Sequence, residues 1–152
     1  QVMGIANPAQ GQLIAEVFRE LGRERALVVH GAGTDEIATH GTTQAWELND
    51  GEIVTYELTP EDLGIKRHEL TDLTGGDGAA NARALRAVFA GRGEPAHCDA
   101  IAATAGAMFY LNGTTRSIAA GVSHAKDLIN SGAVEKWLHI HESANYAVGE
   151  KN

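Results

Sequence analysis

The stretch that decides the fold is Arg25-Ala26-Leu27-Val28-Val29-His30-Gly31. A continuous apolar run between a charged residue and a glycine is typical of a strand that is covered on both faces. A shorter apolar strand is expected over residues 1–6, and between the two strands the apolar positions of residues 9–21 repeat at helical spacing. Asn7 is expected to cap this helix and Gly22 to end it. The order strand, helix, strand predicts a parallel pair joined by a right-handed crossover.

Two further strands and several helices follow. Residues 43–48 and 52–58 have the composition of strands, and the Asp50-Gly51 pair between them is a strong hairpin signal. The tail from Glu142 is expected to fray. Helical spacing of apolar positions recurs in four later segments, residues 79–90, 99–111, 117–129 and 134–141. We therefore expect a single α/β domain over residues 1–152, with a mixed, largely parallel sheet flanked by helices.

The composition is that of an ordinary globular chain with an acidic balance. Hydrophobic residues make up 43% of the chain, and no apolar run approaches the roughly 18 residues of a membrane span. The formal net charge of −8 repels phosphate backbones and anionic lipids, so we expect no nucleic-acid partner and no membrane partner. The single cysteine, Cys98, excludes an internal disulfide and fits a reducing compartment, which makes the cytoplasm the expected location.

The loop after the central strand contains two adjacent acids, Asp35 and Glu36, at the edge where open α/β sheets place their ligands. Two carboxylates on a turn can converge, and Mg²⁺ takes one or two protein carboxylates and fills its other positions with water and phosphate oxygens. The pair therefore suggests a magnesium site. The alternative is that Thr34 caps a helix and the acids favour its positive end, and spacing alone favours this alternative. A dinucleotide site is disfavoured, because Glu36 stands where the glycine-rich fingerprint needs a small residue.

Other candidate sites have structural explanations. Residues 74–78 resemble a phosphate-binding loop, but a turn in which Asp77 caps the next helix is the favoured interpretation. His30 and His40 flank the acidic loop and could position a ligand, although a histidine at a strand end more often bonds its neighbours. The histidine spacing matches no zinc motif, and Cys98 lacks the partners of a nucleophile. We assign no catalytic residue from the sequence.

Several motifs occur together in the order and spacing of one known family. They are Arg25-Ala26-Leu27-Val28-Val29-His30-Gly31, Asp35-Glu36-Ile37, Gly41-Thr42-Thr43, Glu47-Leu48, Asp50-Gly51-Glu52-Ile53, Tyr56-Glu57-Leu58-Thr59-Pro60-Glu61-Asp62-Leu63-Gly64, Gly75-Gly76-Asp77, Asn81-Ala82 and Ser131-Gly132. This series covers nearly the whole chain and resembles the later half of anthranilate phosphoribosyltransferases. The resemblance implies the later part of a catalytic domain of the nucleoside phosphorylase and phosphoribosyltransferase type.

The resemblance also implies a reaction, the transfer of a phosphoribosyl group from phosphoribosyl pyrophosphate to anthranilate, with release of pyrophosphate, in tryptophan biosynthesis. The family's Asp-Glu pair, which Asp35 and Glu36 match, helps to bind Mg²⁺ on the pyrophosphate. The family's principal phosphate loop, its anthranilate-contacting arginine and its small helical domain, through which these enzymes usually form homodimers, belong to the earlier half and are absent here. The isolated chain is therefore expected to be nearly inactive.

Two alternatives remain open. At Ala103-Thr104-Ala105 many family members have Asn-Ala-Ala, and some relatives with this fold bind nucleic acid or process nucleosides. The net charge disfavours the nucleic-acid relatives. The chain opens with Gln1-Val2-Met3 and no initiator methionine, so it could also be a noncatalytic fragment.

Overall fold

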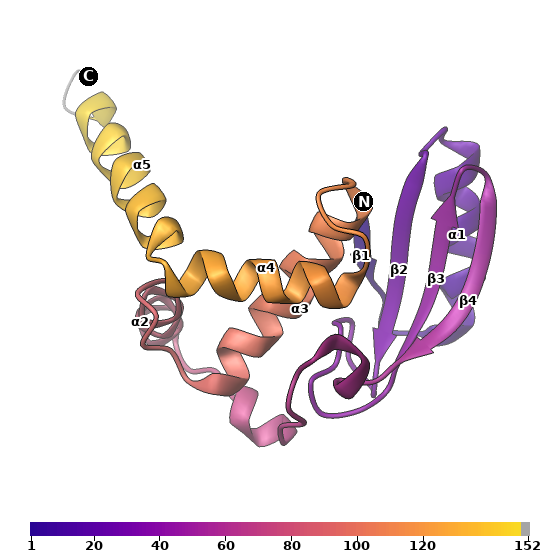
Figure 1. The fold of residues 1–152 in the computed structure, drawn as a ribbon, viewed down its shortest axis with the longest axis horizontal. Coiled ribbons are helices and arrows are strands. Elements are labelled where there is room, and N and C mark those ends of the chain that lie inside the picture. Colours follow the sequence, from indigo (N-terminus) through magenta and orange to yellow (C-terminus); the bar gives the residue numbers. More distant parts are fainter. Residues whose placement is uncertain (150–152) are drawn as a thin grey trace.

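The computed structural model describes residues 1–149, and the side chains of residues 1–141. One four-stranded sheet and the helices that accompany it make up this part of the chain (Figure 1). In chain order the elements are β1 (Val2–Gly4), η1 (Pro8–Gln10), α1 (Gly11–Glu20), β2 (Arg25–Gly31), β3 (Thr43–Asn49), β4 (Glu52–Leu58), η2 (Glu61–Leu63), η3 (Leu70–Leu73), α2 (Gly78–Phe89), α3 (Pro95–Leu111), α4 (Ile118–Asn130) and α5 (Ala133–Gly149), where η marks a short 3-10 helix.

The sheet has the strand order β1-β2-β3-β4. β1 and β2 are parallel, with Met3 opposite Val28, and α1 connects them as predicted. The other two pairings of the described strands are antiparallel, so the sheet is mixed as predicted, but the expectation that it is largely parallel is wrong. The reason is the connections: Asp50 and Gly51, with φ of 48° and 86°, reverse the chain in two residues, and only β1 and β2 are separated by a crossover helix.

Helices cover both faces of the sheet (Figure 1). α1 packs Ala15 and Phe18 against one face, where Val28 of β2 is fully buried. α3 and α4 cover the other face, and there Leu27 and Val29 of β2 belong to the larger core cluster. Neighbouring residues of β2 thus point into two different cores, which explains why this strand is apolar without alternation.

α3 and α4 pack backbone against backbone at a pair of glycines. A Cβ on Gly106 would lie 2.5 Å from the backbone nitrogen of Val122, and a Cβ on Gly121 would lie 2.2 Å from the carbonyl oxygen of Gly106. The absence of side chains at these two positions lets the helices approach this closely. Small residues in α3 therefore serve close helix packing.

Two helix boundaries differ from the prediction. α3 begins at Pro95, four residues earlier than predicted, because proline fits the first helical position, where its missing N–H costs nothing. α5 continues to Gly149, through the tail that was expected to fray, and it projects away from the sheet (Figure 1). Within the residues that the structure describes, no helix combines the length and the apolar character needed to cross a bilayer.

Candidate functional site

A tight turn at the end of β2 opens the acidic loop. The Gly31 N–H donates to the Thr34 carbonyl at 3.0 Å, and the Thr34 N–H donates to the Gly31 carbonyl at 2.9 Å. Ala32 and Gly33 form the corner, with φ of 45° and 90°. The left-handed conformation costs an alanine roughly 1–2 kcal/mol. The turn therefore depends on contacts that hold Ala32 in place.

The turn contradicts the helix-capping explanation of the two acids. Residues 35–42 form an irregular loop, and the Thr34 hydroxyl bonds backward to the Gly31 carbonyl at 2.7 Å instead of forward to a helical N–H. Asp35 and Glu36 are both exposed, and among the described side chains neither carboxylate has a hydrogen-bond or ion-pair partner. Both carboxylates therefore remain available to a cation, and a carboxylate is a ligand that Mg²⁺ accepts from a protein.

The acidic loop lies directly on the ends of β1 and β2. A Cβ on Gly4 would stand 1.5 Å from the carbonyl oxygen of Asp35, and a Cβ on Gly31 would stand 2.3 Å from the carbonyl oxygen of Glu36. Glycine within a strand often marks such a close backbone approach. The two acids thus lie at the carboxyl edge of the parallel pair, where the sequence predicts them.

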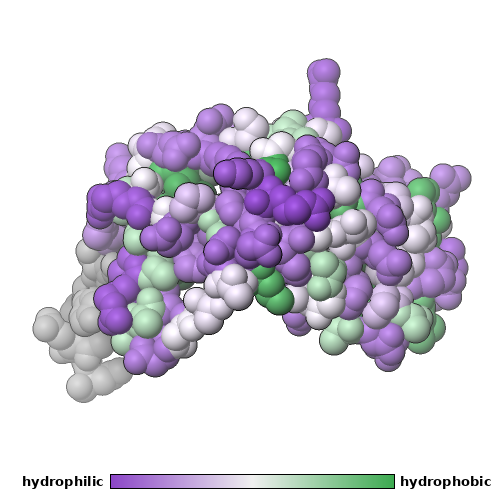
Figure 2. Space-filling view, turned by 90° about the horizontal axis from the view of Figure 1, so that it is seen from below, coloured by the Kyte–Doolittle hydropathy of each residue, from purple (hydrophilic) through white to green (hydrophobic). Residues whose placement is uncertain are grey.

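A cavity of about 670 Å³ opens beside the two acids. Its walls come from the acidic loop, from η3 and from one side of α3, and its apolar lining includes Ile37, Leu70, Leu73, Ile101, Ala105 and Met108. Figure 2 shows the molecule from the side on which β2 ends, where hydrophilic residues cover most of the surface and smaller apolar groups lie between them. Asp35 and Glu36 supply the negative charge of a cavity whose size suits a small organic ligand.

The two histidines that flank the loop are bonded to backbone carbonyls. His30 Nδ1 lies 2.9 Å from the Ile5 carbonyl, and His40 Nε2 lies 3.3 Å from the Ala32 carbonyl. A carbonyl only accepts, so each of these ring nitrogens carries the proton. In the part of the chain that the structure describes, no group of three or more His, Cys, Asp or Glu side chains could hold a metal ion. The loop offers a cation two carboxylates, the number that Mg²⁺ usually takes from a protein.

The glycine-rich segment at residues 74–78 is a helix start. Asp77 accepts a hydrogen bond from the Ala80 N–H at 2.7 Å and caps α2. The Asn81 side chain bonds the N–H and the carbonyl of Gly76, at 2.8 and 3.1 Å. The structural interpretation of this segment is therefore confirmed, because Gly76 and Asp77 are both engaged within it.

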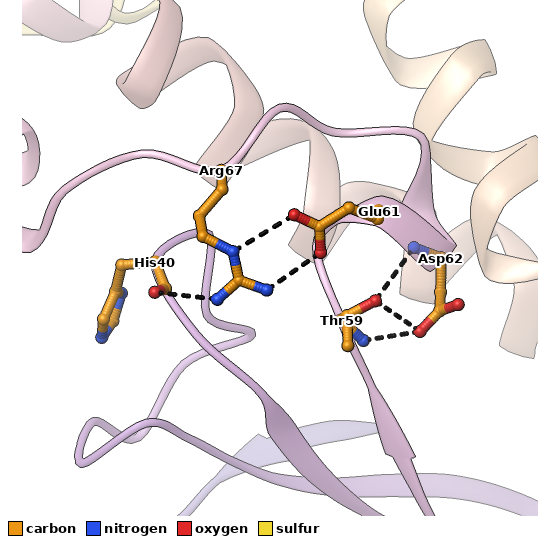
Figure 3. A network of polar contacts seen from close by, with 5 residues as sticks. All are labelled: His40, Thr59, Glu61, Asp62 and Arg67. Carbon is orange, nitrogen blue, oxygen red and sulfur yellow. Dashed lines mark hydrogen bonds and ion pairs between the residues drawn. The ribbon is translucent and has the colours of Figure 1, made fainter.

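A polar network joins the acidic loop to η2 (Figure 3). Arg67 donates two hydrogen bonds to the Glu61 carboxylate, from Nε at 3.1 Å and from Nη2 at 3.0 Å, and a third to the His40 carbonyl, from Nη1 at 3.3 Å. The hydrogen bonds from Arg67 lower the pKa of Glu61. Beside them the Thr59 hydroxyl donates to Asp62 at 2.6 Å, which holds the start of η2 and lowers the pKa of Asp62. Sequence reasoning missed this network, whose only signal is a pair of opposite charges six positions apart.

A buried network ties the same segment to α3 and α4. His68 Nε2 lies 2.7 Å from Asp99 Oδ2, and Lys126 Nζ lies 2.7 Å from Asp99 Oδ1. Asp99 is only 8% exposed, so its carboxylate needs these partners to offset the cost of burial. The three residues come from three separate segments, and no spacing in the sequence marks them.

Toward the other end of β2, Glu47 accepts hydrogen bonds from the hydroxyls of Tyr56 and Tyr110, both at 2.7 Å. Arg25 lies 3.8 Å from the same carboxylate and stacks on the Tyr110 ring at 4.6 Å. Burial, followed by the bond to Glu47, raises the pKa of Tyr56 far above its ordinary value. The pKa of Tyr110 is raised first by its bond to Glu47 and then by burial. This cluster ties α3 to the sheet at the end opposite the acidic loop.

Comparisons with known proteins agree with this architecture. Residues 1–135 match the family model described as Glycosyl transferase family, a/b domain. An anthranilate phosphoribosyltransferase of Corynebacterium aurimucosum is 74% identical over 151 residues, which make up 99% of this chain and 44% of that protein. The chain therefore spans less than half the length of this relative.

Solved structures have the same fold. The crystal structure of anthranilate phosphoribosyltransferase from Thermus thermophilus aligns with a TM-score of 0.82 at 37% identity, over 90% of this chain and 40% of that one. The same enzyme from Saccharomyces cerevisiae in complex with PRPP and Mg aligns with a TM-score of 0.80 at 23% identity, over 91% of this chain and 40% of that one. The matched family model and the mixed sheet covered on both faces lead to one conclusion: this chain belongs to the glycosyl transferase family, in the part described as its a/b domain.

Proposed function

We propose that the complete protein containing this chain transfers a phosphoribosyl group from phosphoribosyl pyrophosphate to the amino group of anthranilate, releasing pyrophosphate, in tryptophan biosynthesis. The observation that carries the proposal is the pair of exposed, unpaired carboxylates, Asp35 and Glu36, on the rim of a cavity at the carboxyl edge of β2. The names of the relatives support the reaction, and the donor and Mg of the yeast complex are those proposed here.

In this proposal Asp35 and Glu36 hold Mg²⁺ against the pyrophosphate. Mg²⁺ would neutralise the negative charge that develops on pyrophosphate as it leaves. Their proposed role is to bind and orient the cation, not to transfer a proton. The walls of the cavity that η3 and α3 supply are mainly apolar and border the two acids.

The rest of the active site lies in other parts of the complete protein. We propose that this chain forms the later part of a catalytic domain, and that the phosphate loop, the anthranilate-contacting residues and a small helical domain belong to the remaining length that the relatives have. On the resemblance we also propose that the complete protein is a homodimer. A cytoplasmic location is proposed from the single cysteine, Cys98, and size-exclusion chromatography with cell fractionation tests both statements.

The metal role predicts the effect of removing one charge. In the complete protein, Asp35→Asn and Glu36→Gln should each raise the Mg²⁺ concentration needed for half-maximal rate by at least about tenfold, since outer-shell partners of metal ligands already contribute this much. Folding should be nearly unchanged, because both side chains are exposed and unpaired. Initial rates measured at fixed substrates and varied Mg²⁺ provide the test.

The matched control is Asp50→Asn, an exposed acid in the β3–β4 turn, where asparagine also tolerates the positive φ. This variant should keep the parental Mg²⁺ requirement. If the Asp35 and Glu36 variants also keep it, the metal assignment is wrong. Tight binding of nucleic acid, without Mg²⁺-dependent binding of phosphoribosyl pyrophosphate, would favour a nucleic-acid-binding relative instead.

A further inference from the structure

We infer that Arg67 is a positioning residue for the carboxylate pair: it holds the far end of the acidic loop and thereby sets where Asp35 and Glu36 lie. The inference rests on the proposed metal role of these acids. Its basis is the Arg67 guanidinium, which donates to the His40 carbonyl at 3.3 Å while Glu61 holds it in place with two hydrogen bonds (Figure 3).

The acidic loop is fixed at its start by the strand ends. The backbone of residues 35 and 36 packs closely against Gly4 and Gly31, and this contact fixes the position of the two residues on the strand ends. The His40 ring donates to the Ala32 carbonyl at 3.3 Å, so the end of the loop also supports the strained corner that precedes the acids. A contact that fixes His40 therefore stabilises the loop both before and after Asp35 and Glu36.

Two consecutive residues hold the far end of the loop. The His68 N–H donates to the Thr39 carbonyl at 2.9 Å, and Arg67 donates to the next carbonyl, that of His40. The side chain of His68 is itself anchored to the buried carboxylate of Asp99 at 2.7 Å. The His68 contact is thus part of the core, whereas the Arg67 contact lies at the surface and can be removed alone.

Because the side chain of Arg67 is exposed, its role in positioning the loop can be distinguished from a role in the stability of the fold. The side chains of Arg67 and Glu61 are 46% and 57% exposed, and ion pairs this exposed contribute little to folding. The two parallel hydrogen bonds nevertheless fix the orientation of the planar guanidinium. Losing Arg67 should therefore leave the fold intact but allow the loop more positions, and a metal site that must be ordered on binding binds more weakly.

The test compares Mg²⁺ dependence in variants of the complete protein. Arg67→Ala should raise the Mg²⁺ concentration for half-maximal rate by about three- to tenfold, the size expected for the net loss of one hydrogen bond. The kcat at saturating Mg²⁺ should stay within about twofold, since the carboxylates themselves are still present. Arg67→Lys should be intermediate, because lysine keeps a donor for the His40 carbonyl but cannot form the bidentate contact with Glu61.

Arg19→Ala is the matched control, because Arg19 is similarly exposed, at 43%, and pairs with Glu20 at 3.8 Å on α1. It should leave the Mg²⁺ requirement unchanged. A lower melting temperature of Arg67→Ala with an unchanged Mg²⁺ requirement would make Arg67 purely structural and overturn the inference. The Asp35→Asn variant distinguishes the positioning role of Arg67 from the metal role of the acids. If Asp35→Asn raises the Mg²⁺ requirement and Arg67→Ala does not, only the positioning role fails. If neither variant raises the Mg²⁺ requirement, the proposed metal role fails as well.

Discussion

Glu47 contacts two tyrosines and helps to raise the pKa of each of them. Its carboxylate accepts from the hydroxyls of Tyr56 and Tyr110 at 2.7 Å, so each phenol that loses its proton loses a hydrogen bond and meets a negative charge. The folded chain therefore keeps both phenols protonated beyond their ordinary range, and the raised pKa values of the two tyrosines follow from this arrangement.

We predict that the free energy of unfolding falls steeply above about pH 10. Below the ordinary pKa of 10.0 the Tyr56 phenol is protonated in both states, and above it the unfolded chain ionises first, because the pKa is raised only in the folded state. Each proton by which the two states differ lowers the free energy of unfolding by about 1.4 kcal/mol per pH unit. Urea unfolding between about pH 8 and pH 11 should therefore give a shallower alkaline decline for Tyr56→Phe than for the parent, with Tyr110→Phe between them. Parallel declines in all three proteins would contradict this account.

At the scale of elements, the glycine contact between α3 and α4 determines how closely these two helices pack beside the sheet. We predict that Gly121→Ala lowers the free energy of unfolding by about 1–3 kcal/mol, because the added Cβ would meet the Gly106 carbonyl at 2.2 Å and the helices would have to separate. Gly78→Ala is the control, because a Cβ there has nothing within 4 Å and alanine favours the helix. Urea unfolding should therefore give Gly121→Ala a free energy of unfolding well below that of the parent, and Gly78→Ala one at or above that of the parent. Equal effects of the two substitutions would show that the glycine contact is not needed.

The local signals of the sequence were sufficient for most elements. Asn7 bonds the Ala9 N–H, Asp77 caps α2 and Gly22 has a φ of 72°, all as predicted from residue type and position. The β3–β4 hairpin likewise follows from Asp50-Gly51. Two interpretations are wrong: the alternative in which Thr34 starts a helix, which spacing alone favoured, and the expectation of a largely parallel sheet, since β3 is antiparallel to β2. Both depend on the path that residues 32–42 take across the ends of the strands, and no local repeat of apolar positions predicts this path.

At the scale of the whole molecule, the chain contains one part of the proposed machinery. We predict that it is nearly inactive alone, because it spans 44% of its relative from C. aurimucosum and positioning of both substrates contributes much of an enzyme's rate. Co-expression with a segment supplying the remaining length should restore phosphoribosyl pyrophosphate-dependent consumption of anthranilate. The same experiment with the Asp35→Asn chain should require more Mg²⁺. Full turnover by the parent chain alone would contradict the prediction.

The sequence by itself determined the strands, the approximate positions of the helices, the caps at Asn7 and Asp77, and the position of Asp35 and Glu36 after β2. These features depend on residue type and on periods of a few residues. Only the tertiary structure decided the irregular course of the acidic loop, the cavity beside it and the contacts of Arg67, His68 and Glu47. His68 and Asp99 are 31 positions apart, and Glu47 and Tyr110 are 63 apart. Contacts between residues so far apart in the sequence form only when the helices pack on the sheet, so no pattern within a short stretch of sequence predicts them.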